Sequence, residues 1–250
     1  MGHRPVIRVG VGGWTYAPWR ETFFPKGLPH RSELEFASRA FSSVEVNGTY
    51  YGAQKPDSFA RWHDETPDDF VFALKAPRFA TNRRVLAEAG ASIERFFASG
   101  VLRLAAKLGP INWQFMPTKA FDPDDFTAFL KLLPKSIEGR PIRHAVEVRH
   151  ASFDTPDFTA LAGAHEVAVV VAGDSDYPRI ETRTAPFTYA RIMGTAEHEP
   201  CGYSAQAIET WARTAQGWAG TKGRRDVFLY VIGGWKQANP AAAMALRARI

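Results

Sequence analysis

The residues of this sequence that could do chemistry are charged and amide side chains set into short apolar runs. In VEVNGTYY, Glu45 and Asn47 alternate with valines, so the two polar side chains share one face of a period-2 strand. Similar positions near the ends of other runs hold Lys75, Gln114, Glu147, Arg149, Asp174 and Arg191. Carboxylates transfer protons, and lysine and arginine bind anions. These residue types point to acid–base chemistry on a charged substrate.

Eight apolar or alternating runs, bounded by glycine, proline or aspartate, are candidate strands. They cover residues 7–14, 43–51, 70–77, 111–117, 144–150, 167–174, 187–194 and 226–234. Most segments between them are helix-like, such as residues 122–133 and 204–219. This alternation predicts an α/β protein whose residues 1–250 form a single (β/α)8 TIM-barrel domain.

Three local features refine the barrel. Residues 175–186 are short and rich in Pro, Asp and Thr, so we expect an incomplete helical ring after the sixth strand. Ser32 and Glu35 have the spacing of a capping box for a helix over residues 32–41, and the last helix is expected at residues 241–249. A doubly wound open sheet is the structural alternative, but no Gly-x-Gly-x-x-Gly turn follows the first run.

Every second residue of a barrel strand points inward. The polar side chains named above share one side of their strands, and the residues on the other side are mostly aliphatic, so we place the polar side chains inside the barrel. Three carboxylates (Glu45, Glu147, Asp174) then face three cations (Lys75, Arg149, Arg191). Such a set forms either a closed salt-bridge network or a ligand site. We expect a solvent-reachable site, because these residues lie near the carboxyl ends of their strands, where barrel enzymes hold their chemistry.

Composition narrows the class of protein. The 250 residues are 45% hydrophobic with a net charge of +5, and the single cysteine excludes an intrachain disulfide. No segment has the pattern of a signal peptide or a membrane span, so we expect a cytoplasmic protein with no membrane partner. The oligomeric state is not predicted.

Several blocks, in order, resemble the YecE-like family, the domain of unknown function 72. They are GGWTYAPWRETFFP, VEVNGTYY, LKAPRFAT, LGPINWQFMP, VEVRHASF, ARIMG and GYS. The resemblance implies a TIM barrel of unestablished activity. It also implies functional positions at Trp14, Tyr16, Trp19, Glu45, Asn47, Tyr50, Tyr51, Lys75, Gln114, Glu147, Arg149, His150, Asp174 and Arg191. The sequence departs from the family pattern at Asn82, Met193 and Gly233-Gly234, which puts chemistry that needs the usual histidines and asparagines in doubt.

The candidate roles divide into catalysis and binding. Glu45, Glu147 and Asp174 are the catalytic candidates, and Arg78 joins the family positions as an anion-binding candidate. The aromatic side chains after the first two strands suit stacking on a sugar or a base, or packing on one another. No cofactor is predicted outright, although Glu45, Glu147, Asp174 and His150 have the chemistry to hold Mg²⁺ or Mn²⁺.

Two hypotheses of function follow. The first is an acid–base enzyme of hydrolase or lyase type, acting on a small anionic or sugar/phosphate-containing substrate at the carboxyl mouth of the barrel. The second is a non-catalytic or degenerate barrel that binds a metabolite or nucleic acid.

Overall fold

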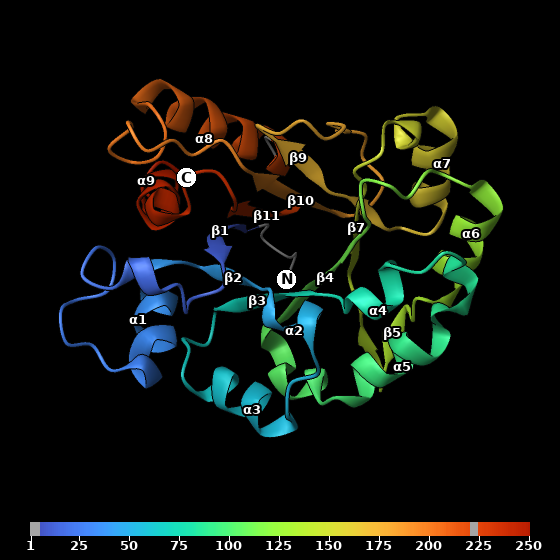
Figure 1. The fold of residues 1–250 in the computed structure, drawn as a ribbon, viewed down its shortest axis with the longest axis horizontal. Helices are drawn as coiled ribbons and strands as arrows, with labels where there is room; N and C mark the ends of the chain where they lie inside the picture. Colours follow the sequence, from blue (N-terminus) through green and yellow to red (C-terminus); the bar gives the residue numbers. More distant parts are fainter. Residues whose placement is uncertain (1–5, 221–224) are drawn as a thin grey trace.

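A parallel sheet closes around the centre of the molecule in the computed structural model, which describes residues 6–220 and 225–250 (Figure 1). Its strands are β1 (Ile7–Gly12), β2 (Ser43–Val46), β3 (Val71–Lys75), β4 (Leu108–Gln114), β7 (His144–Glu147), β8 (Ala168–Val169), β9 (Val171–Gly173), β10 (Phe187–Ile192) and β11 (Asp226–Val231). The order is β8-β7-β4-β3-β2-β1-β11-β10-β9. Because β8 and β9 are separated only by Val170, they are two pieces of one run, and the barrel closes there.

Helices surround this sheet (Figure 1). The α-helices are α1 (Glu33–Ala40), α2 (Gly48–Tyr51), α3 (Pro56–Asp64), α4 (Arg78–Thr81), α5 (Gly90–Ala98), α6 (Pro123–Leu132), α7 (Pro156–Ala164), α8 (Ala205–Ala219) and α9 (Asn239–Arg247). Short 3-10 turns are η1 (Ala17–Trp19), η2 (His30–Ser32), η3 (Leu86–Ala89), η4 (Val101–Lys107), η5 (Ala151–Phe153) and η6 (Lys236–Ala238). A small hairpin, β5 (Ser136–Ile137) with β6 (Arg140–Pro141), lies outside the barrel sheet.

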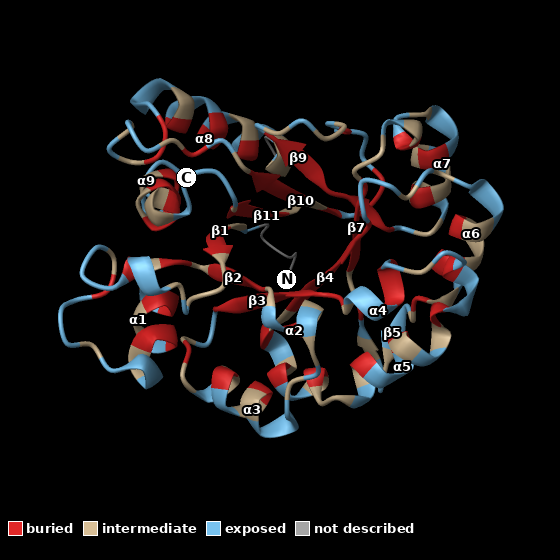
Figure 2. Cartoon of the chain, in the orientation of Figure 1, coloured by how far each residue is buried: buried red, intermediate tan, exposed pale blue. Residues whose placement is uncertain are grey.

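Two apolar layers hold the barrel. Val44, Val46 and similar outward side chains pack against the helices, whose outer faces are exposed (Figure 2). Inside, toward the amino ends of the strands, Phe187, Tyr189 and Phe228 fill the interior together with Val71, Ala73, Ala145 and Tyr230. The carboxyl half of the interior is left to polar side chains.

The predicted barrel and its gap in the helical ring are confirmed. Every one of the eight runs contributes to the sheet, and residues 174–186, all described, contain no helix. In the described ranges, no helix combines the length and apolar character needed to cross a membrane.

Four details differ from expectation. The run 43–51 ends as a strand at Val46, because Asn47 has helical backbone angles (φ −82°, ψ −20°) and begins α2. The sixth run breaks into β8 and β9. The capping box does not form: Ser32 lies within η2, and its side chain makes no capping hydrogen bond. The last helix begins at Asn239, two residues early, with Pro240 in its first turn.

Glycine at position 10 is required by the approach of β1 to β2. A Cβ there would lie 1.8 Å from the carbonyl oxygen of Ser43, a backbone atom that cannot turn aside. We expect Gly10→Ala to lower the free energy of unfolding by about 1–3 kcal/mol or more, measured by urea denaturation. Gly217→Ala is the control. It meets no atom within 4 Å on α8 and should be neutral or stabilising by roughly 0.5–1 kcal/mol; equal effects would contradict this account.

Candidate functional site

One guanidinium ties together the two glutamates of the barrel interior. Arg191 on β10 donates from Nη1 to Glu147 Oε2 (2.5 Å) and from Nη2 to Glu45 Oε1 (3.2 Å). Glu45 lies on β2 and Glu147 on β7, and both are fully buried. The predicted inward parity is thus confirmed for these three residues. The expectation that they form a solvent-reachable site is wrong, because Glu45 and Glu147 are fully buried, Arg191 is 3% exposed, and the three form a closed ion network.

Neutral side chains complete the carboxylate contacts. Asn112 Nδ2 donates to both Glu45 Oε2 (3.3 Å) and Glu147 Oε2 (3.2 Å), and the hydroxyl of Tyr189 donates to Glu45 Oε2 (2.5 Å). Burial and the neighbouring carboxylate raise the pKa of Tyr189, so it stays a donor. Each carboxylate therefore accepts several hydrogen bonds, as a buried anion must.

The network fixes its protonation states. Burial favours a neutral Glu147, but Arg191, Arg149 and Lys75 outweigh burial and lower its pKa to about 2. Burial likewise opposes the charge of Arg191, yet Glu147 and Glu45 raise its pKa above the ordinary value. At neutral pH Glu147 is an anion, which suits structural support better than proton donation.

Arg149 extends the network toward the mouth. It follows β7, and its Nε and Nη2 atoms donate to Glu147 Oε1 at 2.8 and 2.6 Å. Nη2 also donates to Gln114 Oε1 (2.9 Å), and the guanidinium lies 4.4 Å from the centre of the Tyr177 ring. Because its side chain keeps 17% exposure, Arg149 reaches solvent where Glu147 does not.

Lys75 has a different environment from the other cations. It ends β3 and is only 7% exposed, and no hydrogen bond or ion pair joins its Nζ to another described residue. Its Nζ lies over the ring of Tyr50, 4.3 Å from the ring centre, in a cation–π contact. Burial, followed by repulsion from Arg191, lowers the pKa of Lys75 to about 8, although Glu45 and Glu147 oppose the change.

A cavity of about 420 Å³ opens beside these residues, at the carboxyl ends of β1 and β2. Trp14, Tyr16, Asn47 and Tyr51 line it, together with Lys236, which lies 4.3 Å from the Tyr16 ring centre. We name it the mouth cavity. Lys75 does not line it, but Tyr50 links the two, since its ring contacts both the lysine amine and Tyr51 in the cavity wall. α2 is also held to the end of β3, where Thr49 Oγ1 donates to the carbonyl oxygen of Lys75 (2.7 Å).

Asp174 lies apart from the two glutamates. It follows β9 with a left-handed backbone (φ 52°) and accepts from Trp211 Nε1 (2.8 Å); burial, followed by the Asp174 carboxylate, raises the pKa of the nearby Tyr203. These residues line a separate groove of about 630 Å³ beside α8, with Arg179. The three predicted catalytic residues are therefore not brought together.

Three further candidates have local roles. Trp19 is fully buried and donates from Nε1 to the carbonyl of Lys236 (2.9 Å), which helps to hold η6 at the mouth. His150 Nδ1 accepts from the Ser152 amide and caps η5. Arg78 is exposed, with its guanidinium 5.4 Å from the Phe79 ring centre.

The residues named for a divalent cation do not assemble. Among the described residues, no group of three or more His, Cys, Asp or Glu side chains is placed to hold a metal ion. Glu45 and Glu147 accept from arginine and asparagine instead, and His150 caps a helix.

The departures from the family pattern lie at the mouth. Asn82 ends α4 and is exposed. Met193 follows β10 and lies against Gly233, where an added Cβ would be 3.5 Å from Met193 Cβ. Two of the altered positions therefore face each other after adjacent strands.

Fold and site together define a parallel α/β barrel with a buried ion network under a polar, aromatic mouth. The chain belongs to the DUF72 family, described as proteins of unknown function, whose model matches residues 8–250. It is 30% identical over 148 residues to UPF0759 protein YecE of Escherichia coli K12, covering 59% of this chain and 50% of that protein. Identity to UPF0759 protein YunF of Bacillus subtilis 168 is 26% over 159 residues, covering 61% and 54%. The matches thus span about half the length of these relatives.

Solved structures with the same fold include DUF72 family proteins of two organisms. The Thermotoga maritima protein has a TM-score of 0.74 at 21% identity, covering 96% of both chains. For the Enterococcus faecalis protein the TM-score is 0.75 at 17% identity, covering 98% of this chain and 95% of that one. A D-psicose 3-epimerase is more distant, with a TM-score of 0.52 at 12% identity and coverage of 97% and 96%. At these identities the likeness concerns the fold alone.

Some site residues were not selected from the sequence. Tyr189 shares the inward face of Arg191, so parity alone could have included it. Lys236, Tyr177 and Tyr203 lie in segments after strands, where no sequence pattern indicates which side chain turns toward the mouth.

Removing the charge of Glu147 tests the network. Glu147→Gln leaves Arg191 and Arg149 without their shared anion, so the free energy of unfolding at pH 7 should fall by roughly 3–5 kcal/mol. Because folding lowers the pKa of Glu147, its charge stabilises the folded protein at pH values above its ordinary pKa of 4.5. This contribution is lost as the pH falls from 4.5 toward 2. The difference between wild type and variant should shrink over that interval, measured by urea denaturation at each pH.

Glu209→Gln is the matched control. Glu209 is 51% exposed and pairs with Arg213 and Arg249 at 3.7 Å, so its loss should cost below about 1 kcal/mol. A similarly small cost for Glu147→Gln, or a cost independent of pH, would mean that the network is hydrated rather than closed.

The amine of Lys75 should titrate near pH 8 in the folded protein. Competitive acetylation with isotope-labelled acetic anhydride, mapped by mass spectrometry across pH, gives the midpoint for this residue. In urea the midpoint should return to the ordinary 10.5, because burial no longer disfavours the charged form. A folded-state midpoint at or above the unfolded one would contradict the described environment.

Proposed function

We propose that this protein is an acid–base enzyme acting on a small anionic or sugar/phosphate-containing substrate at the carboxyl mouth of the barrel. The observation that carries the proposal is the amine of Lys75. It is buried against Tyr50, whose ring contacts Tyr51 in the wall of the mouth cavity. It has no acceptor among the described residues, and its pKa is lowered to about 8. Amines of this kind exchange protons near neutral pH, as general bases and acids must.

Glu45 and Glu147 belong to the ion network beneath this amine. Their oxygens are occupied by donors from Arg191, Asn112 and Arg149. The charges of the two carboxylates and the two arginines in the network cancel. A charged Lys75 would add a net positive charge, which burial and repulsion from Arg191 oppose. Their use as proton donors or acceptors, expected from the sequence, stays a prediction.

The lining of the mouth cavity supports the substrate class. Four aromatic side chains (Trp14, Tyr16, Tyr51 and Trp62) and the amide of Asn47 line it, and Lys236 provides a positive charge. Aromatic rings pack on the apolar faces of sugars, amides bond to hydroxyl groups, and a lysine suits a phosphate or carboxylate. A hydrolase or lyase of such compounds is the reaction class that fits a basic amine in this position.

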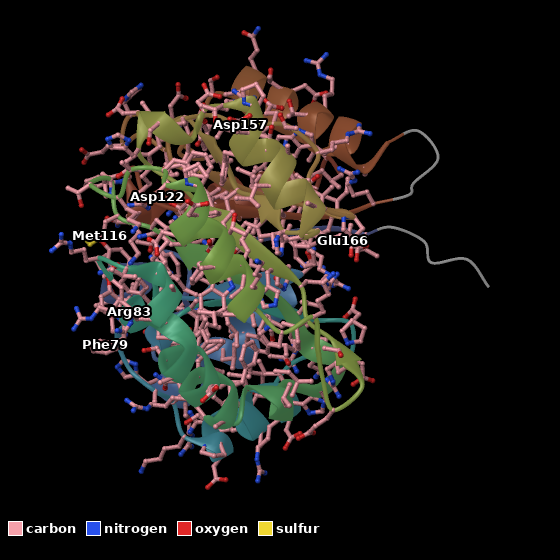
Figure 3. All side chains as sticks on the ribbon, turned by 90° about the vertical axis from the view of Figure 1, so that its right-hand side faces the viewer. Phe79, Arg83, Met116, Asp122, Asp157 and Glu166 are labelled. Carbon is pink, nitrogen blue, oxygen red and sulfur yellow. The ribbon has the colours of Figure 1, made fainter. Side chains whose placement is uncertain are left out.

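A specific observation favours the second candidate, nucleic-acid binding. Phe79 on α4 is 60% exposed, with Arg78 beside its ring, and Arg83 follows on the same segment. Figure 3 shows Phe79, Arg83 and Met116 along one side of the molecule, with Glu166 on the opposite side. Exposed aromatic and arginine side chains together suit stacked bases and phosphates.

Two single variants separate the candidates. Tyr51 is 64% exposed and lines the mouth cavity, whereas the similarly exposed Phe79 does not. Tyr51→Ala should weaken binding of ribose 5-phosphate, measured by calorimetric titration, roughly tenfold, since losing an aromatic contact costs about 1 kcal/mol or more. Phe79→Ala should leave it unchanged.

The reverse pattern would favour the alternative. Salt-sensitive binding of a fluorescent oligonucleotide, lost with Phe79→Ala but not with Tyr51→Ala, would replace a small-molecule site by a nucleic-acid surface. Binding of ribose 5-phosphate that neither variant affects would remove the mouth cavity from the proposal.

A further inference from the structure

Lys75 and Lys107 are the deeply buried lysines among the described residues, and their amines have different contacts. Lys107 is 4% exposed, and its Nζ donates to the carbonyl oxygens of His63 (2.5 Å) and Thr66 (2.7 Å). The amine of Lys75, at 7% exposure, makes no such bond within the part of the chain that the structure describes. The protein therefore holds the amine of Lys107 through its own carbonyl groups but leaves the amine of Lys75 without a protein acceptor.

The nearby carboxylates do not engage this amine because the rest of the network uses them. Glu147 accepts from Arg191, Arg149 and Asn112, and Glu45 accepts from Arg191, Asn112 and Tyr189. The nitrogen of Lys75 also differs from Arg191 Nε, which is sealed from solvent without a partner. Lys75 Nζ is not sealed in this way, and Tyr50, which contacts it, also contacts Tyr51 in the wall of the mouth cavity.

We propose that Lys75 forms an imine with the carbonyl carbon of a small aldehyde or ketone that carries a phosphate or carboxylate group. This inference rests on the proposed function, because it uses the same mouth cavity to bind the substrate. The anionic group would lie toward Lys236, and the carbonyl toward Tyr50 and the end of β3.

The reaction balances without an oxidant or a reductant. The lone pair of the neutral amine attacks the carbonyl carbon, the carbonyl oxygen takes up a proton, and the nitrogen loses one, which gives a carbinolamine. Its hydroxyl group then takes a proton from solvent and leaves as water, while the nitrogen lone pair forms the C=N bond. One water molecule is released for each imine formed.

The environment favours this step over attack by an ordinary lysine. With a pKa of about 8, about one tenth of the amine is unprotonated at pH 7, against roughly one in three thousand at 10.5. The protonated imine carries the same single positive charge as the ammonium group that it replaces. The ion network beneath is therefore undisturbed by the covalent step.

Borohydride trapping tests the inference on the intact protein. The protein is incubated with glyceraldehyde 3-phosphate, reduced with sodium borohydride, and mapped by peptide mass spectrometry. Labelling of Lys75 should exceed that of Lys107 and of the exposed lysines by tenfold or more, and inorganic phosphate should reduce it. Lys75→Arg keeps the charge and removes the nucleophile, so this labelling should be absent, with thermal unfolding as the check on folding.

The outcomes separate this inference from the function on which it rests. Labelling spread over exposed lysines, with none above background at Lys75, would overturn the imine. If ribose 5-phosphate binding still depends on Tyr51, the proposed acid–base function survives that result. If neither labelling at Lys75 nor Tyr51-dependent binding is found, both proposals fail. Because the wild-type map alone locates the label, the conclusion does not depend on the folding of Lys75→Arg.

Discussion

The contact on which the rest of this barrel depends is the double ion pair of Arg191. One guanidinium crosses the interior from β10 to reach carboxylates on β2 and β7, strands separated in the sheet by β3 and β4. Removing two carboxylates and a guanidinium from water has a large desolvation free energy, which ion pairs and hydrogen bonds to these groups offset. Asn112, Tyr189 and Arg149 supply those partners, so the carboxyl half of the barrel is organised around a single side chain.

That organisation decides the chemistry of the mouth. Glu147 is shared by two arginines, and the attraction of Glu45 and Glu147 for Lys75 does not outweigh burial and repulsion from Arg191, so the pKa of Lys75 is lowered to about 8. Asp174 differs again, because it accepts from Trp211 at a different groove. Charged residues that look alike in the sequence thus differ in environment, because each one makes different contacts in the barrel.

The sequence predicts the barrel well because strand parity and strand–helix alternation are local signals. The inward set of Glu45, Lys75, Glu147 and Arg191 follows from counting every second residue. Its pairing does not, since Glu45 and Arg191 are 146 residues apart and only the closed sheet brings them together. Two failures have local causes: Asn47 turns into a helix where the pattern continues as a strand, and the left-handed backbone of Asp174 accompanies its displacement from the glutamates.

Apolar side chains close the barrel interior at the amino ends of the strands. Phe187, Phe228 and their neighbours close it, and Ser43 bonds to the Tyr230 hydroxyl (2.7 Å) in the same region. The ion network lies between this apolar layer and the mouth, so the described side chains leave no passage through the barrel. A molecule that binds at the mouth must also leave through the mouth. On the proposed function, a product that keeps the anionic group of its precursor would occupy the binding position of the next substrate, and its release through the mouth would limit turnover.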